Sequence, residues 1–415
     1  MTQRSNFRVF LVFVIFFMIS LLTNIIGPLV PDIIKSFGLS LTMAAFLPFS
    51  FFVAYAVMSI PSGLIIERSG EKPVLVGAFA LALAGSTLFS LFPAYPTALL
   101  SLFMIGLGMA ALQVAINPLL RVAGGEEHFA FNSVVAQVVF GGASFLSPLL
   151  YSHFALNMHK EGKGLLVETL SKIVPQNLPW ISMYWVFTVV TILMIVIILC
   201  SPLPRVKRNE DEKVGAMEIH LQLMRMPVVW LYFVGIFSYV GIEQGIANWM
   251  SEFLSSRHGF NPQVEGADAV SRFWLLITAG SALGLVLLKF FDSKKILLGF
   301  SLSALFVLSA AIFGAKDTSL WAFSFMGFSI SVMWSIVFSL ALNSLAAHHG
   351  TYSGILCTGI VGGAVVPLLI GSIGDHFGLQ AGLCFLYLPI LYILSMGFWA
   401  APLIKNKTFL DEKKS

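Results

Sequence analysis

Charged residues are scarce in this chain of 415 residues: they make up 11% of it, against 58% hydrophobic residues. A soluble domain carries roughly a quarter charged residues. The few charges also gather in short clusters between long apolar runs, whereas a soluble protein spreads them over its surface. The shortage excludes a soluble globular protein and predicts one that is buried in a lipid bilayer. It also excludes a nucleic-acid binder, because the net charge of +4 forms no basic stripe with interleaved aromatic residues.

Cysteine is nearly absent, and the chemical motifs of enzymes are missing. The three cysteines, Cys200, Cys357 and Cys384, lie in apolar runs without CxxC or Cys/His spacing, so we expect no disulfide, no metal site and no cofactor. No Walker-type glycine-rich loop is present, so ATP does not drive this protein. No histidine cluster, paired acids or nucleophile with a base lies at membrane depth. We therefore expect a protein that is not an enzyme.

Long apolar runs are what the sequence has in abundance. A helix needs roughly 20 apolar residues to cross the hydrocarbon core of a bilayer. Twelve runs meet this requirement: 9–31, 42–66, 73–93, 98–122, 130–154, 180–203, 228–254, 268–291, 294–314, 319–346, 351–373 and 380–403. The sequence predicts an all-α membrane protein of twelve transmembrane helices, with one sizeable outer loop, 156–178, that has room for a short surface helix.

The distribution of lysine and arginine sets the expected orientation. With the N-terminus in the cytoplasm, 17 of the 24 lysine and arginine residues fall on the inner side. Cytoplasmic loops carry such an excess, and an even number of spans puts both ends of the chain on one side. We expect a multi-pass protein of the cell inner membrane with both termini in the cytoplasm.

The two halves of the chain resemble each other at an offset of about 221 residues. Gly141-Gly142-Ala143 with Pro148 in the fifth span matches Gly362-Gly363-Ala364 with Pro367 in the eleventh, and two further matches flank the 2–3 and 8–9 turns. Duplicated six-helix halves place a substrate near the membrane midplane between them. The expected domains are an N-terminal half (1–203), a cytoplasmic linker (204–227), a C-terminal half (228–404) and a cytoplasmic tail (405–415).

The 2–3 turn carries the motif by which the chain resembles the major facilitator superfamily. The motif is a glycine, three residues, an acid, a base, one residue, a glycine and then basic residues. It stands here as Gly63, Glu67, Arg68, Gly70 and Lys72, with Glu67 in place of the usual Asp and Glu71 where a base is common. The resemblance implies a secondary transporter in which this turn is a conformational clasp that latches the halves in one state. The alternative is an ordinary surface turn.

Within that superfamily, the chain is most similar to the fucose:proton symporter family of sugar permeases. The similarity rests on Ala115 to Pro118 in the fourth span, His128 to Asn132, Tyr239 to Glu243 in the seventh span, and Gly362 to Pro367 with Gly371 to Asp375. It implies import of a monosaccharide or a related small polar solute, coupled to H⁺ or Na⁺. That family uses an Asp in the first span and a Glu in the fourth. Gly27 and Gln113 stand at these positions here, so its proton mechanism does not carry over unchanged.

Polar residues inside the spans are the candidate site. An ionisable residue at membrane depth costs about 2.5–3.5 kcal/mol and is a functional candidate by default, which singles out Glu243 for ion coupling. Neutral amides suit sugar hydroxyls because they both donate and accept hydrogen bonds, although amides also join helices together. The candidate substrate-binding residues are Asn24, Gln113, Asn117, Gln137, Tyr239, Glu243, Gln244, Asn248 and Trp334.

Two other functions stay open at this point. An exporter of a drug or metabolite with the same fold would need a large apolar cavity rather than an amide-rich midplane. A sensor built on a transporter fold would have the same sequence features. The expected partners are a sugar-like solute, H⁺ or Na⁺ and the lipid bilayer, and the resembled fold works as a monomer.

Overall fold

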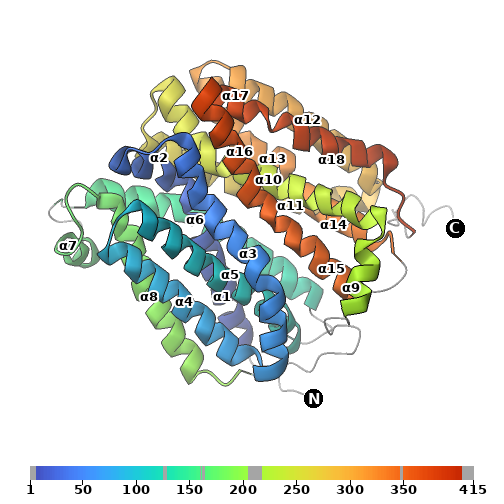
Figure 1. The fold of residues 1–415 in the computed structure, drawn as a ribbon, viewed down its shortest axis with the longest axis horizontal. Coiled ribbons are helices and arrows are strands. Elements are labelled where there is room, and N and C mark those ends of the chain that lie inside the picture. Colours follow the sequence, from blue (N-terminus) through green and yellow to red (C-terminus); the bar gives the residue numbers. More distant parts are fainter. Residues whose placement is uncertain are drawn as a thin grey trace. The chain divides into compact units, whose positions relative to one another are not determined.

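The structure is a computed structural model, and it describes residues 6–124, 129–158, 160, 164–203, 217–345 and 349–403. Every regular element in this part of the chain is a helix (Figure 1). The first part of the chain forms α1 (Asn6–Thr23), α2 (Ile26–Phe37), α3 (Leu41–Ser69), α4 (Glu71–Leu91), α5 (Tyr95–Gly124), α6 (Phe129–Asn157), α7 (Leu165–Ser171), η2 (Pro179–Ile181) and α8 (Ser182–Cys200).

The remainder is helical in the same way. It forms α9 (Met217–Met224), α10 (Pro227–His258), η4 (Pro262–Gly266), α11 (Ala267–Phe290), α12 (Ser293–Phe313), α13 (Lys316–Ile330), α14 (Met333–Leu342), α15 (His349–Thr358), η5 (Gly359–Val361), α16 (Gly362–Phe377), α17 (Leu379–Cys384) and α18 (Tyr387–Trp399).

Twelve helical stretches in the described residues are long and apolar enough to cross a membrane, which confirms the predicted number. The first and last residues of some spans differ from those predicted. The first span runs from Phe7 to Phe37 rather than over 9–31, because the helix continues through Asp32 and Lys35. It stops at Gly38, whose φ of 61° is left-handed. The short helix α7 lies in the predicted outer loop.

Contacts divide the chain into two units. Unit 1 contains Met1–Lys207 together with Ser251–Ser271, and unit 2 contains Arg208–Met250 together with Arg272–Ser415. The ends of α10 and α11 that flank η4 therefore group with the N-terminal helices, although they follow the predicted linker in the sequence. The division into halves at 203 and 228 stays a prediction, and residues 204–216 and 404–415 lie outside the described residues.

Several spans are interrupted. The first span breaks between α1 and α2 at Asn24 and Ile25, the tenth between α13 and α14 at Ser331 and Val332, and the eleventh at η5. Breaks at membrane depth are tolerated only where the freed backbone groups find partners or line a cavity. Around the first break, the backbone N–H of Asn24 donates to the Ser20 carbonyl at 3.0 Å. Thr23 Oγ1 donates to the Ile19 carbonyl at 2.7 Å.

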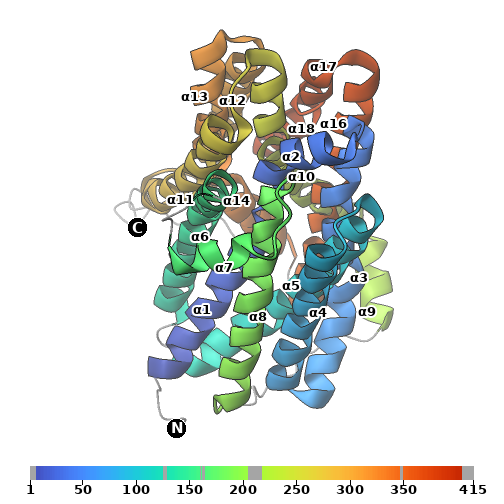
Figure 2. The same cartoon turned by 90° about the vertical axis from the view of Figure 1, so that its left-hand side faces the viewer.

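Glycines allow the helices of each unit to pack backbone against backbone. In unit 1, α5 lies beside α3 and α4 (Figure 2), and a Cβ added at Gly106 would lie 2.3 Å from the Phe51 carbonyl oxygen. In unit 2, a Cβ at Gly362 would lie 2.0 Å from the Phe237 carbonyl oxygen. Small residues at such seams replace the hydrophobic driving force that is missing between helices in lipid.

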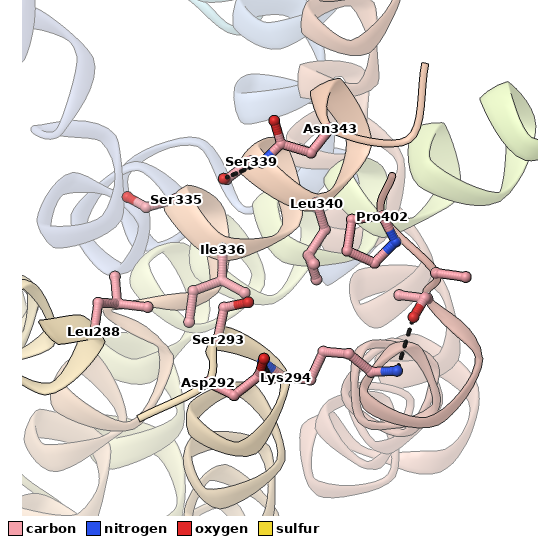
Figure 3. Close-up of a pocket in the computed structure, with 12 residues that line it drawn as sticks. Leu288, Asp292, Ser293, Lys294, Ser335, Ile336, Ser339, Leu340, Asn343 and Pro402 are labelled. Carbon is pink, nitrogen blue, oxygen red and sulfur yellow. Dashed lines mark hydrogen bonds between the residues drawn. The ribbon is translucent and has the colours of Figure 1, made fainter. Parts of the chain in front are cut away.

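A lysine ties the third span to the sixth in unit 1, and a second lysine repeats the contact in unit 2. Lys72, at the start of α4, donates from Nζ to the carbonyls of Leu199 (2.8 Å) and Ser201 (2.9 Å) at the end of α8. Lys294, at the start of α12, donates to the Ala400 carbonyl (2.7 Å) after the end of α18 (Figure 3). A cation at a helix C-terminus satisfies carbonyls that have no partner within the helix and complements the helix dipole.

We predict that Gly106→Ala destabilises the protein, because the added methyl group meets backbone that cannot move aside. Overpacking of this kind costs about 1–3 kcal/mol, so the apparent melting temperature of the purified protein in detergent should fall. The matched control is Gly77→Ala in α4, since a Cβ at Gly77 meets nothing within 4 Å. Equal melting temperatures for the two variants would contradict this description of the α3–α5 seam.

We also predict that Lys294→Met lowers the apparent melting temperature by about 2–4 °C. The substitution keeps the aliphatic stem and removes the hydrogen bond to Ala400, which we value at about 1 kcal/mol for a half-buried charged donor. The exposed neighbour Lys295 is the control, and Lys295→Met should melt like the wild type. If the two variants melt at the same temperature, Lys294 does not hold α12 to α18.

Candidate functional site

The central polar cluster of unit 2 lies on one helix, α10. Tyr239 donates from its hydroxyl to Glu243 Oε2 at 2.6 Å, and Gln244 donates from Nε2 to Glu243 Oε1 at 3.0 Å. Asn248 donates to Gln244, at 2.8 Å to its carbonyl and at 3.3 Å to Oε1. Tyr239, Gln244 and Asn248 are buried, while Glu243 is half-buried. The spacing of four residues between Tyr239 and Glu243 puts both side chains on one face of the helix.

Two aromatic rings from α14 adjoin this cluster. The Trp334 ring lies 5.8 Å from the Tyr239 ring at an angle of 55°, and it stacks on Phe338 at 5.7 Å and 17°. Trp334 is the second residue of α14, directly after the break in the tenth span. Phe338 was not among the candidates from the sequence; its position one helical turn after Trp334 was the available signal. The carboxyl group of Glu243 and its neighbouring amides therefore lie beside stacked aromatic rings.

Close packing between α10 and α16 holds the cluster in place. A Cβ at Gly241 would lie 2.4 Å from Val366 Cγ2. Trp249 donates from Nε1 to the Pro367 carbonyl at 3.0 Å. Gly362 and Pro367, which the sequence repeat picked out, therefore help to position the helix that carries Glu243.

Arg272, the ionisable residue near the start of the eighth span, lies over the Trp321 ring at 4.4 Å from its centroid. Its Nε donates to Ser324 Oγ at 3.3 Å. The oxygens of Glu243 accept from the Tyr239 hydroxyl and the Gln244 amide instead, so neutral donors surround the carboxyl group.

The candidate amides of unit 1 differ in their surroundings. Asn24 is buried and donates from Nδ2 to Ser144 Oγ at 2.8 Å, which joins the break in the first span to α6. Gln113 on α5 is half-buried and Gln137 on α6 is exposed. The side chain of Asn117 lies outside the described residues. Contact of these four amides with a substrate stays a prediction.

The residues of the 2–3 turn hold helix ends. Gly70 has a φ of 84° and ends α3, and Gly63 is buried. Lys72 bonds to the sixth span of its own unit, as described above. Arg68 is exposed, and the side chain of Glu67 lies outside the described residues. A role of this turn as a clasp between the halves stays a prediction.

One acid in a span was not a candidate from the sequence. Asp32, on α2, accepts two hydrogen bonds on Oδ2: one from the Tyr151 hydroxyl at 2.5 Å and one from Gln263 Nε2 at 3.0 Å. Its signal in the sequence was a lone carboxyl group within the apolar first span, five residues after Gly27.

A cavity of about 410 Å³ lies in unit 2 at the ends of α11, α14 and α18 and the start of α12 (Figure 3). Ser335, Ser339 and Asn343 contribute polar groups to its wall. It is separate from the Glu243 cluster, since none of the cluster residues lines it. No group of three or more His, Cys, Asp and Glu side chains in the described part of the chain could hold a metal ion.

Twelve spans, a carboxyl group with amides in mid-span and glycine-packed helices are the features expected of a secondary transporter. The chain belongs to the Major Facilitator Superfamily, whose family model matches residues 12–359. This confirms the resemblance that the 2–3 turn predicted, and it places the chain among transporters rather than enzymes.

Two curated relatives and one solved structure illustrate the similarity. A glucose/galactose transporter of Brucella abortus biovar 1 (strain 9-941) is 29% identical over 398 residues, which cover 93% of this chain and 91% of the relative. The L-fucose-proton symporter of Escherichia coli (strain K12) is 24% identical over 383 residues, covering 88% and 86%. The crystal structure of the E. coli fucose:proton symporter FucP has a TM-score of 0.66 at 20% identity, covering 95% of this chain and 99% of that chain.

Proposed function

We propose that this protein imports a monosaccharide, or a closely related small polar solute, by alternating access coupled to an ion gradient. The observation that carries the proposal is the arrangement of Tyr239, Glu243 and Gln244 beside Trp334 in unit 2. A pyranose has an apolar face of C–H groups and an edge of hydroxyl groups. The cluster offers an aromatic ring for the first and polar atoms for the second.

The hydrogen-bonding capacity of Glu243 fits hydroxyl groups. A carboxylate has about four acceptor positions, and Tyr239 and Gln244 occupy one on each oxygen. The remaining positions accept from sugar hydroxyls without disturbing the network. The names of the relatives support this class of substrate, because one transports glucose and galactose and another transports L-fucose with a proton.

Glu243 is also the proposed coupling residue. A charged group inside the membrane is costly, so a carboxylate there is stabilised when it binds H⁺ or Na⁺ together with the sugar. The acids that the symporter family uses are replaced here by Gly27 and Gln113. Because neither replacement can be ionised, we assign the ion coupling to Glu243. One relative is named an L-fucose-proton symporter, and we therefore favour H⁺ as the coupling ion.

We propose that the protein works as a monomer in the cell inner membrane, with both termini in the cytoplasm. The halves 1–203 and 228–404 would rock about the bound solute, the 2–3 turn would act as their clasp, and Asn24, Gln113, Asn117 and Gln137 would complete the sugar site from the first half. An exporter of apolar drugs is not proposed, since the cluster at Glu243 is polar.

The proposal is tested by counterflow in proteoliposomes that contain the purified protein and are preloaded with one sugar at a time. Glucose, galactose, L-fucose and N-acetylglucosamine form the panel, and sucrose is the negative control. We expect exchange of at least one monosaccharide and none of sucrose. Absence of exchange for every monosaccharide would overturn the proposed substrate class.

For the sugar identified in this way, we predict that Glu243→Gln abolishes accumulation against a gradient and leaves part of the exchange. Glutamine keeps the shape and can still accept from Tyr239, but it cannot bind a proton or balance a cation. The measurement is uptake into proteoliposomes under an imposed proton or sodium gradient. Glu252→Gln, a second acid on α10, is the control and should accumulate sugar normally. Uphill uptake by Glu243→Gln at the wild-type rate would exclude the coupling role.

A further inference from the structure

The hydrogen bonds of Asp32 join three elements that lie far apart in the sequence. Asp32 belongs to α2, Tyr151 to α6, and Gln263 to η4. Asp32 is half-buried, and its carboxyl oxygen Oδ2 accepts from both donors. Such an oxygen is costly to leave without partners, so each donor stabilises the position of Asp32. Through Gln263, Asp32 in turn stabilises the position of η4.

The turn around Gln263 is built to present this side chain. Asn261 Oδ1 accepts from the backbone N–H of Gln263 at 2.9 Å, and Glu265 Oε2 accepts from the backbone N–H of Asn261 at 3.0 Å. The Gly266 amide donates to the Asn261 carbonyl at 3.0 Å. These local bonds fix the backbone of the short helix η4, so little backbone ordering is needed for the Gln263 side chain to reach Asp32.

The segment that carries Gln263 belongs to unit 1, although its neighbours in the sequence belong to unit 2. Ser251–Ser271 groups with unit 1, while the residues before and after it, on the same helices α10 and α11, belong to unit 2. A second bond also holds this segment, since Ser271 Oγ donates to the Phe145 carbonyl in α6 at 2.8 Å. The segment is thus bonded to α2 and α6 and covalently continuous with the helix that carries Glu243.

We propose that the contact between Asp32 and Gln263 is a latch that holds the membrane face opposite the N-terminus closed and that opens once in every transport cycle. The inference rests on the proposed function, because alternating access requires the second half to leave the first on that face before a solute can enter. Asp32 is then a positioning residue of the transport cycle. Tyr151 orients it from within the first half, and Gln263 is the part that detaches.

Gln263→Met is the variant that tests the latch. Methionine has about the same length and flexibility as glutamine but has no donor for Asp32. The matched variant Gln263→Lys keeps a donor and adds a positive charge beside the acid, so it should keep the latch closed. Both are made in a protein whose Cys200, Cys357 and Cys384 are replaced by serine.

A single reporter cysteine reads the position of the segment. Val270→Cys, the segment reporter, places it at a fully buried position within the segment, and a membrane-impermeant maleimide is added from outside to intact cells. Val174→Cys, the loop reporter, lies at a buried position in the predicted outer loop, away from the segment in sequence. It detects a general loosening of the outer face. Neither measurement needs a transported sugar, so a wrong substrate class does not affect the outcome.

With Gln263→Met, we expect the segment reporter to be labelled about tenfold faster, the change produced by losing one hydrogen bond to an acid, and the loop reporter to be labelled at its original rate. Gln263→Lys should label as slowly as the parent protein at both positions. An unchanged labelling rate of the segment reporter in Gln263→Met would overturn the latch. Equal acceleration at both reporters would overturn it as well, because the contact would then support only the general packing of that face.

Discussion

In the hydrocarbon core of a membrane, a polar group without a hydrogen-bond partner costs several kcal/mol, and the structure of this protein depends on that cost. It makes every span a helix, in which the backbone satisfies itself. Because of this cost, buried hydroxyl groups within the spans donate hydrogen bonds to the carbonyls four residues earlier in the same helix, as those of Thr23, Ser86 and Thr191 do. At the helix ends, where carbonyls run out of partners, Lys72 and Lys294 supply the donors.

The same cost makes the exceptions informative. Glu243 and Asp32 are acids that a span retains only with neutral donors around them, and each has a tyrosine hydroxyl and a glutamine amide on its carboxyl group. Their neighbourhoods differ in what they can do. Glu243 and its amide neighbours lie on one continuous helix, α10, beside the aromatic rings of α14, which suits a bound solute. Asp32 joins elements that are distant in the chain, which suits a contact that forms and breaks.

The sequence was sufficient for the fold and for part of the polar cluster on α10. Hydrophobic runs fixed the number of spans because the bilayer allows one kind of spanning element here, and a four-residue spacing was enough to place Tyr239 beside Glu243. The partners of Asp32 could not be predicted, since the pairing of residues 32, 151 and 263 depends on tertiary packing. The break at Ser331 and Val332, which sets the start of α14, contains neither proline nor glycine, and the nearest glycine, Gly327, lies four residues earlier inside α13. The carbonyl partners of Lys72 were equally hidden, because backbone atoms leave no pattern in a sequence.

The central claim is that the sugar binds at the Glu243 cluster. A structure of the wild-type protein with a bound monosaccharide tests it most directly. The account predicts a pyranose ring against Trp334, with at least one hydroxyl within hydrogen-bonding distance, roughly 2.6–3.0 Å, of a Glu243 carboxyl oxygen. A sugar bound elsewhere, with Tyr239, Glu243 and Gln244 still bonded to one another and out of its reach, would contradict the account.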